Sequence, residues 1–280
     1  MPMLSAPPRG ELPVREIRPL KRRVRVRDLF AHWPLVWQLA LRDYQVRFKQ
    51  AALGPIWVLA QPLGILLALT VVFQEVTTVD TGGIPYAAFA LPGITVWTFA
   101  TTCLAMGSRT FIANKKLVTH VACPRTPFVT ASVLSAAPNL LLPLGMTLVS
   151  VVALLGVPPL QIVAFPVFMV MLIVLVWSLT LVLASLNVRL RDVSNVVPFL
   201  LQGGLFLTPI GYPLASVDGW LQVLLYANPF TGIIELWRWA LLGSAIDALL
   251  VAVTVVETTL ALLLGWRLFA RLEVKFADII

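Results

Sequence analysis

The distribution of basic residues constrains this chain more than any other feature, because it predicts how the chain lies across a membrane. Six long apolar stretches separate the charged segments, which can be assigned alternately to two sides. One side then holds all but one of the 21 Lys and Arg residues, and the other holds only Arg238 among them. Loops rich in Lys and Arg stay in the cytoplasm when a chain inserts into a bilayer. We therefore expect an even number of crossings, with both termini in the cytoplasm.

The apolar stretches themselves set the fold class. A helix needs about 20 apolar residues to cross the hydrocarbon core, and this chain is 59% hydrophobic and only 12% charged. The net charge of +8 then reflects orientation and attraction to anionic headgroups rather than nucleic-acid binding. The pattern predicts an all-α integral membrane protein with six transmembrane helices, near residues 53–73, 86–106, 128–155, 162–186, 196–210 and 246–268.

The ends of the chain differ from this apolar middle. Residues 1–32 are basic, rich in proline and without an apolar signal sequence, so we expect a disordered cytoplasmic arm that touches lipid headgroups, or a regulatory tail. Residues 33–50 are expected to form an amphipathic interface helix and residues 51–270 the transmembrane domain. A cytoplasmic tail over 271–280 follows.

The interface helix is predicted from two opposite stripes at helical spacing. The apolar stripe comprises Trp33, Trp37, Leu41, Tyr44 and Phe48, and the polar stripe comprises Gln38, Arg42, Gln45 and Lys49. Such a helix lies in the plane of the membrane surface, with its aromatic side chains in the acyl boundary. It serves either as an anchor alone or also as a docking surface for a cytoplasmic partner.

Two connections are too long to be bare turns. The cytoplasmic loop 107–127 is either a positively charged topology signal or a short helix that projects onto another protein. The external stretch 213–244 is expected to form a helical hairpin, with a short helix over 220–226 and a second one that begins at Asn228-Pro229. Glu235 and Arg238 in that second helix are spaced to form a solvated ion pair.

Several chemistries have no motif in this chain. It contains no GxxxxGK[ST] phosphate loop, no HExxH and no CxxC, so we expect neither an enzyme nor a metal site. Glu257 is the one ionisable residue deep in a span, which is thin support for ion-coupled transport. The energy source is therefore expected outside the chain. Five aromatic residues serve either as packing and interface belt or as the flat walls of a sugar channel: Trp57, Trp97, Phe99, Phe206 and Tyr212.

An ordered set of short motifs resembles the ABC-2-type permeases, the membrane subunits of bacterial exporters of O-antigen, wall teichoic acid and galactan. The resemblance covers roughly residues 33–278. It rests on Trp37 to Ala40 with Arg42-Asp43 and Arg47-Phe48, Leu53-Gly54 with Trp57, Gln61-Pro62, Asn114 to Val118, Pro124-Arg125, Leu186 to Arg189 with Arg191-Asp192, Thr208-Pro209-Ile210, Tyr226 to Pro229, Glu235 and Arg238.

The resemblance implies an ABC-2 (type V) exporter permease that works as a homodimer. Two copies of a separate cytoplasmic ATPase subunit would dock below it and carry ATP and Mg, with no cofactor on this chain. The residues expected at the ATPase contact are Asn114, Lys115, Lys116, Leu117, Arg125, Arg189, Arg191 and Asp192. The residues expected in short external gate helices are Tyr226, Asn228, Pro229, Glu235 and Arg238.

We therefore expect the permease subunit of an exporter for a lipid-linked polysaccharide in the bacterial inner membrane. The anionic pyrophosphate head of the substrate is expected to enter near Arg42, Arg47 and Lys49. An ABC-2 exporter of drugs or small lipids is one alternative. A polyprenyl-linked membrane glycosyltransferase is another, but it requires acidic clusters such as DxD or DDxxD, and the sequence has none.

Overall fold

The computed structural model describes residues 31–49, 54–76, 79–120, 124–273 and 276. Most of the predicted arm over 1–32 and most of the tail over 271–280 therefore lie outside the described residues. Within the described part the chain is helical and contains no strand, which confirms the all-α prediction. The helices are α2 (Trp33–Phe48), α3 (Trp57–Thr70), α4 (Tyr86–Ser108), α5 (Thr110–Ala113), α6 (Lys115–His120), α7 (Thr126–Ser135), α8 (Pro138–Leu155), α9 (Phe165–Arg189), α10 (Val193–Gly204), α11 (Trp220–Tyr226), α12 (Pro229–Leu242) and α13 (Ala248–Leu272).

Five helical stretches in the described residues are long and apolar enough to cross a membrane. They are Trp57–Gln74, Tyr86–Ser108, Thr126–Leu155, Leu160–Arg189 and Ala248–Leu272. The chain is therefore a multi-pass membrane protein. The prediction of six helical spans is not confirmed, because the stretch near 196–210 is not one continuous helix. Helix α10 ends at Gly204 after 12 residues, and turns follow it.

This interrupted stretch nevertheless runs along the whole of α4. At one end, Asn187 Nδ2 donates to the Ser108 carbonyl (2.8 Å), and Asn187 Oδ1 accepts from the Ser194 amide (3.1 Å). At the other end, Tyr86 Oη donates to the Gly211 carbonyl (3.0 Å). Tyr86 and Ser108 are the first and last residues of α4, a helix of 23 residues. At 1.5 Å per residue, the two contacts lie roughly 35 Å apart along the helix axis.

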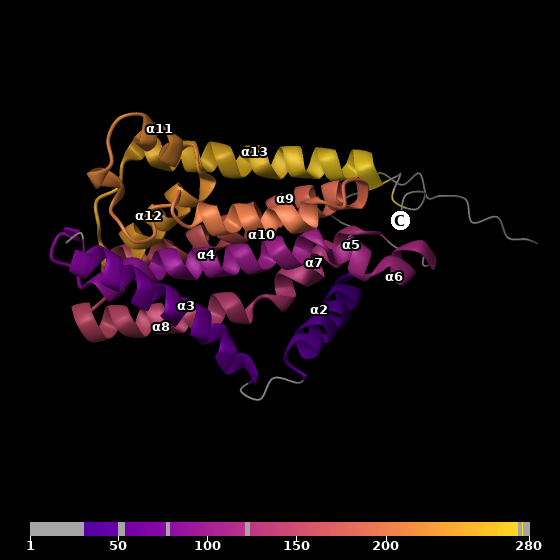
Figure 1. Cartoon of the computed structure of the whole chain (residues 1–280), viewed down its shortest axis with the longest axis horizontal. Coiled ribbons are helices and arrows are strands. Elements are labelled where there is room, and N and C mark those ends of the chain that lie inside the picture. Colours follow the sequence, from indigo (N-terminus) through magenta and orange to yellow (C-terminus); the bar gives the residue numbers. More distant parts are fainter. Residues whose placement is uncertain (1–30, 50–53, 77–78, 121–123, 274–275, 277–280) are drawn as a thin grey trace, which may run out of the picture.

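The long helices lie side by side, and short elements cover the two ends of the bundle (Figure 1). Helices α2, α5 and α6 and the C-terminus lie at one end, which we call the basic end. Helices α11 and α12 lie at the other, the α12 end. Helix α4 is the central helix, because 78% of its span is buried, against 17% to 39% for the other four spans.

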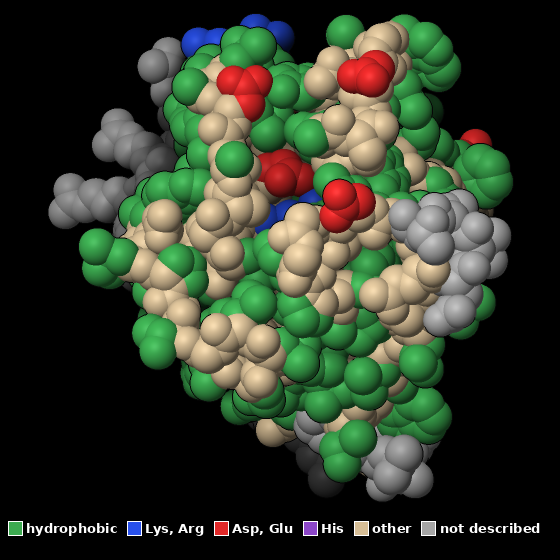
Figure 2. All heavy atoms as spheres, turned by 90° about the vertical axis from the view of Figure 1, so that its left-hand side faces the viewer, with side chains coloured by type: hydrophobic (Ala, Val, Ile, Leu, Met, Phe, Trp, Pro, Cys, Tyr) green, Lys and Arg blue, Asp and Glu red, His purple; other side chains and the backbone are tan. Residues whose placement is uncertain are grey.

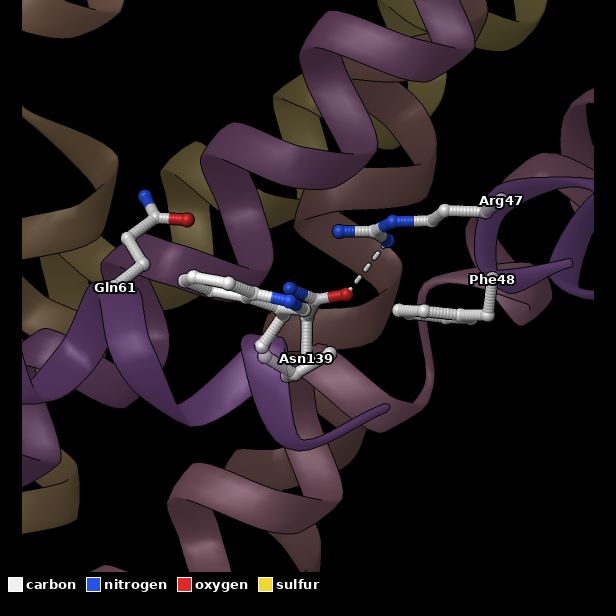
Figure 3. Close-up of a pocket in the computed structure, with 6 residues that line it drawn as sticks. Arg47, Phe48, Gln61 and Asn139 are labelled. Atoms are coloured by element: carbon white, nitrogen blue, oxygen red, sulfur yellow. Dashed lines mark hydrogen bonds between the residues drawn. The ribbon is translucent and has the colours of Figure 1, made fainter. Parts of the chain in front are cut away.

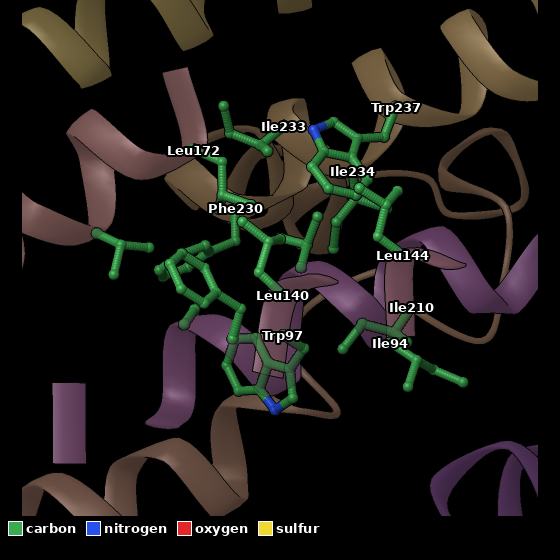
Figure 4. Packing of buried hydrophobic residues seen from close by; sticks show 14 of the residues in the cluster. Ile94, Trp97, Leu140, Leu144, Leu172, Ile210, Phe230, Ile233, Ile234 and Trp237 are labelled. Atoms are coloured by element: carbon green, nitrogen blue, oxygen red, sulfur yellow. The ribbon is translucent and has the colours of Figure 1, made fainter. Parts of the chain in front are cut away.

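The main core surrounds α4 at its middle and toward the α12 end. The Trp97 ring packs edge-on against Phe230 of α12 at 5.7 Å, and Gly204 of α10 lies so close to Trp97 that a Cβ there would clash with the indole. Trp237 packs against Phe165 of α9 at 4.7 Å. Figure 4 shows Trp97, Phe230 and Trp237 in one cluster with Leu140, Leu144 and Leu172 from α8 and α9.

The helix predicted over 33–49 is present as α2, but it has a third face that its two stripes do not show. Val36, Leu39 and Ala40 are buried in a second cluster with Phe128 and Val129 of α7. Trp33 and Trp37 remain about half exposed on the apolar stripe, where a membrane surface helix needs them. Helix α2 is therefore packed on the bundle as well as amphipathic.

Candidate functional site

A pocket of about 280 Å³ opens at the basic end between α2, α3 and α8. It lies where the first turn of α3 meets the break between α7 and α8, which Ala136, Ala137 and Pro138 create. Its walls combine two aromatic rings, two amides and one guanidinium. The lining residues are Arg47, Phe48, Trp57, Val58, Gln61 and Asn139 (Figure 3).

Arg47 reaches from α2 across this pocket. Its Nη1 donates to Asn139 Oδ1 at 2.7 Å and lies 3.7 Å from Met106 Sδ. The residue as a whole is exposed, but desolvation of its guanidinium end lowers the pKa of Arg47 from the ordinary value. Arginine remains charged in proteins despite such a shift. The pocket therefore holds a fixed positive charge.

Several polar groups of the pocket make no hydrogen bond within the described part of the chain. Among the described residues, Arg47 Nε and Nη2 and the Gln61 amide make no hydrogen bond. Arginine presents its N–H groups in a fork that matches phosphate or carboxylate oxygens. Phe48 and Trp57 supply apolar walls beside this fork, and Trp57 is 56% exposed. The arrangement suits an anionic headgroup carried on an apolar chain.

The other two cations that we expected here lie elsewhere. Arg42 forms an ion pair with Asp43 at 2.6 Å and donates to Asn114 Oδ1 at 2.6 Å. Lys49 is exposed and is not among the residues that line the pocket. Of the three predicted substrate residues, the structure therefore places only Arg47 in a pocket.

The residues predicted to contact an ATPase lie at the basic end. Lys115, Lys116 and Leu117 are exposed on α6, while Val118 of the same helix is buried in the second cluster. Arg189, Arg191 and Asp192 are exposed where α9 gives way to α10. Asn114 is buried, and its amide nitrogen donates to the Thr110 carbonyl at 2.9 Å. The basic end therefore presents exposed cations beside the buried Asn114, which directly precedes α6.

Arg125 has internal partners instead of an open surface. Its amide donates to Glu273 Oε1 at 3.1 Å, its Nη1 donates to the Glu273 carbonyl, and its guanidinium lies 5.8 Å from the Phe276 ring centre. Phe276 is buried against Phe111 and Phe269. Arg125 therefore joins the end of α13 to the loop after α6, and no local pattern near Arg125 indicates these partners.

At the α12 end, the predicted pair of short helices is present as α11 and α12. Asn228 caps α12 by accepting from the Phe230 amide (3.1 Å), Pro229 is the first helical residue, and Gly243 ends the helix with φ 71°. Tyr226 Oη donates to Asp247 Oδ2 at 2.9 Å. These contacts do not test the predicted role of the pair as a gate.

Glu235 and Arg238 are paired at 2.8 Å as their spacing predicts, but the pair is not solvated. The Arg238 side chain is 1% exposed and that of Glu235 is 13% exposed. The expectation of a solvated pair was wrong, because α12 packs into the core instead of lying on the surface. Ten of its 14 residues are buried.

The predicted channel aromatics fall into two groups. Trp97 and Phe99 are 5% and 2% exposed and pack inside the chain, whereas Trp57 and Phe206 are 56% and 70% exposed. Tyr212 is partly exposed, and its hydroxyl donates to the Phe206 carbonyl at 3.2 Å. Only the exposed members are free to contact anything outside this chain.

Comparison with known proteins assigns the fold to a family. The model of the ABC-2 type transporter family matches residues 34–242, which include all but the first residue of α2, the pocket, α6 and the whole of α12. The chain belongs to this family. ABC-2 proteins are the membrane subunits of transporters that work with an ABC ATPase, which fits the exposed cationic surface of α6 at the basic end.

The curated relatives of this ABC-2 protein carry one name. The chain is 27% identical over 215 residues to the O-antigen export system permease protein RfbA of Myxococcus xanthus, covering 76% of this chain and 82% of the relative. It is 22% identical over 241 residues to a protein of the same name from Klebsiella pneumoniae, covering 85% and 92%. The similarity thus extends over nearly the whole length of both relatives.

One pocket residue of this ABC-2 protein was missed by sequence reasoning. Asn139 is the single amide side chain in the span Thr126–Leu155, and it directly follows Pro138. A lone amide beside a proline in an apolar stretch is a signal for a polar site at a helix break. We interpreted that stretch as one uniform span, and so Asn139 was passed over.

Proposed function

We propose that this chain is the permease subunit of an ABC exporter that moves a lipid-linked polysaccharide, such as O-antigen, across the cytoplasmic membrane. The observation that carries the proposal is the alignment with permeases named for O-antigen export over 82% to 92% of their length. These relatives favour a glycan exporter over an exporter of drugs or small lipids. Two copies of the chain and two copies of a separate ATPase form the transporter.

The orientation follows from charge. The described cations outside α12 lie at the basic end or near it, and Arg238 is the single Lys or Arg of the described residues at the α12 end. Positive loops remain in the cytoplasm. The basic end is therefore cytoplasmic in this proposal, and both termini lie inside. The interrupted stretch from Ser194 to Gly211 supplies the sixth crossing, since it runs the length of α4.

The pocket around Arg47 receives the pyrophosphate of the lipid carrier from the cytoplasmic leaflet. The guanidinium fork binds phosphate oxygens, and the apolar walls accept the first part of the polyprenyl chain. ATP binding to the partner subunit moves α6, and the glycan then passes between the two copies. An internal repeat is not visible in the sequence, so the two-fold symmetry common in transporters comes from the second copy.

Loss of this chain tests the proposal in the cell. Cells that lack it should lose the surface glycan and accumulate the same glycan on its lipid carrier at the cytoplasmic face. Mass analysis of the accumulated lipid identifies the substrate, and restoring the gene serves as control. An unchanged surface glycan in the deleted strain would reject the proposed function.

A further inference from the structure

The end of α10 at Gly204 leaves a set of backbone carbonyl groups without helical partners. A helix satisfies its carbonyls internally, and an interruption within membrane depth exposes polar groups that must find other donors. The stretch 204–211 contains Thr208 and Ile210, which are fully buried, so water does not serve these positions. The donors have to come from elsewhere in the protein.

Side chains supply them. Asn228 Nδ2 donates to the Leu207 carbonyl at 2.9 Å, Arg238 Nη2 donates to the Ile210 carbonyl at 2.7 Å, and Tyr86 Oη donates to the Gly211 carbonyl at 3.0 Å. Asn228 and Arg238 lie at the start and in the third turn of α12, and Tyr86 begins α4. The non-helical segment 205–211 is therefore held by α12 on one side and by α4 on the other.

Arg238 is the central member of this set. Besides the Ile210 carbonyl, it donates from Nε to the Phe89 carbonyl (3.2 Å) and from Nη1 to Glu235 Oε1 (2.8 Å). Its guanidinium also lies 3.7 Å from the centre of the Phe89 ring. Phe89 lies in the first turn of α4. One buried cation thus joins the start of α4 to the non-helical segment 205–211.

Glu235 neutralises that cation, and the pair lies at the α12 end of the molecule. Figure 2, which looks onto the α12 end, shows a recess with acidic and basic side chains at its floor and further acidic side chains around it. A buried arginine without a carboxylate partner is strongly destabilising. The Glu235 side chain remains 13% exposed and so connects the buried pair to the outside.

Two side chains of the same segment are exposed on the outside of the chain. Phe206 and Leu207 are 70% and 50% exposed, although the backbone a few residues on is fully buried. Non-helical backbone at membrane depth is found where it lines a substrate path or is buried in protein. One face of this segment is buried in protein, and the other is exposed.

We propose that Arg238, held by Glu235, is the positioning residue that fixes segment 205–211 as the outer wall of the substrate path. The substrate path itself rests on the proposed function. Arg238 does not touch the substrate in this account. It holds the Ile210 backbone against α4, and the position of Phe206 and Leu207 follows from that.

The test compares three variants of the full chain, purified with its ATPase partner. Arg238→Lys keeps the charge but loses the fork, and Glu235→Gln removes the carboxylate charge. Trp237→Phe changes the packing of the same helix against Phe165 and leaves the hydrogen bonds of Arg238 in place. Hydrogen exchange is measured at the backbone amides of residues 206–211 and, as an internal standard, along α9 and α13. Glycan export per molecule is measured in parallel.

We expect Arg238→Lys to speed exchange at 206–211 by about tenfold, because a hydrogen bond to a charged group is lost, while α9 and α13 are unchanged. Glu235→Gln should act in the same direction, and both should lower export per molecule. Trp237→Phe should show neither selective effect.

Exchange that rises equally everywhere in Arg238→Lys, or a selective rise with normal export, would overturn the inference. A wild-type complex that exports no glycan rejects the proposed function instead, and the exchange comparison then decides the role of Arg238 alone.

Discussion

Arg42 Nη2 donates a 2.6 Å hydrogen bond to Asn114 Oδ1, which joins the interface helix α2 to the residue that precedes α6. The two residues are 72 positions apart in the chain. The Asn114 side chain in turn donates a hydrogen bond to the Thr110 carbonyl in α5. Five residues after Arg42 on the same helix, Arg47 contacts Asn139 in the pocket. Helix α2 therefore touches both the loop that is predicted to contact the ATPase and the candidate substrate pocket.

This connection predicts a coupling defect. Replacement of Asn114 by Ala removes the acceptor of Arg42 and should lower the amount of glycan exported per ATP hydrolysed, with ATPase activity retained. Arg42 is 44% exposed, so the bond contributes about 1 kcal/mol, and the ratio should fall about fivefold. Arg42→Gln should have the same effect, and the double variant should be no worse. Gln45→Ala, an exposed change on α2, is the matched control. A normal ratio in Asn114→Ala would remove this bond from the coupling path.

The pocket predicts a difference between two cations on one helix. Arg47→Gln should weaken binding of a polyprenyl pyrophosphate to the complex in nanodiscs by about tenfold, because one charge-assisted contact is lost. Lys49→Gln, which lies outside the pocket, should have little effect, and Arg47→Lys should be intermediate. Titration of each variant with the labelled lipid measures this. Equal weakening by both glutamine variants would mean that the cations act only as a diffuse surface charge.

The aromatic residues predict opposite phenotypes. Trp97→Ala empties a buried site next to Gly204 and Phe230 and should destabilise the fold by about 3–5 kcal/mol, so that the amount of protein in the membrane falls. Phe206→Ala removes an exposed ring and should leave the amount of protein near wild type while export per molecule falls. Immunoblots and export assays on the same membranes separate the two effects. If export per molecule is normal in Phe206→Ala, this ring is not part of the substrate path.

The topology predicts which end a membrane-impermeant thiol reagent can reach. In a chain with Cys123 replaced by Ser, a cysteine introduced at Asp218 should react in intact cells, whereas one at Asp192 should react only after the cells are opened. Both positions are exposed in the fold, and the remaining Cys103 is fully buried. Reaction at Asp192 but not at Asp218 in intact cells would invert the proposed orientation.

Much of the fold could be predicted from local patterns. The stripes that begin at Trp33 predicted α2, and Asn228-Pro229 with Gly243 predicted the limits of α12, because capping and amphipathic spacing depend on neighbours in the sequence. The five long spans followed from apolar length alone. These features require no knowledge of distant contacts.

Local patterns do not show hydrogen bonds between residues that are distant in the sequence. Arg238 reads locally as half of a surface ion pair, but its other acceptors belong to Phe89 and Ile210, 149 and 28 positions away. The ATPase contact of Arg125 stays a prediction, but the sequence around it does not show its hydrogen-bond partner Glu273, which is 148 positions away. The stretch near 196–210 was predicted as a helical span, and nothing near Gly203 and Gly204 shows where α10 ends or which side chains replace its hydrogen bonds.

The central claim is that this chain, with an ABC ATPase, exports a glycan on its lipid carrier. Reconstitution of the purified complex into vesicles that contain the lipid-linked glycan tests it most directly. Addition of ATP to the ATPase-facing side should move the glycan to the opposite leaflet, where a glycosidase confined to that side can cleave it. A complex with an inactive ATPase should leave the glycan protected. ATP-dependent hydrolysis by an intact complex with no glycan becoming accessible would contradict the account.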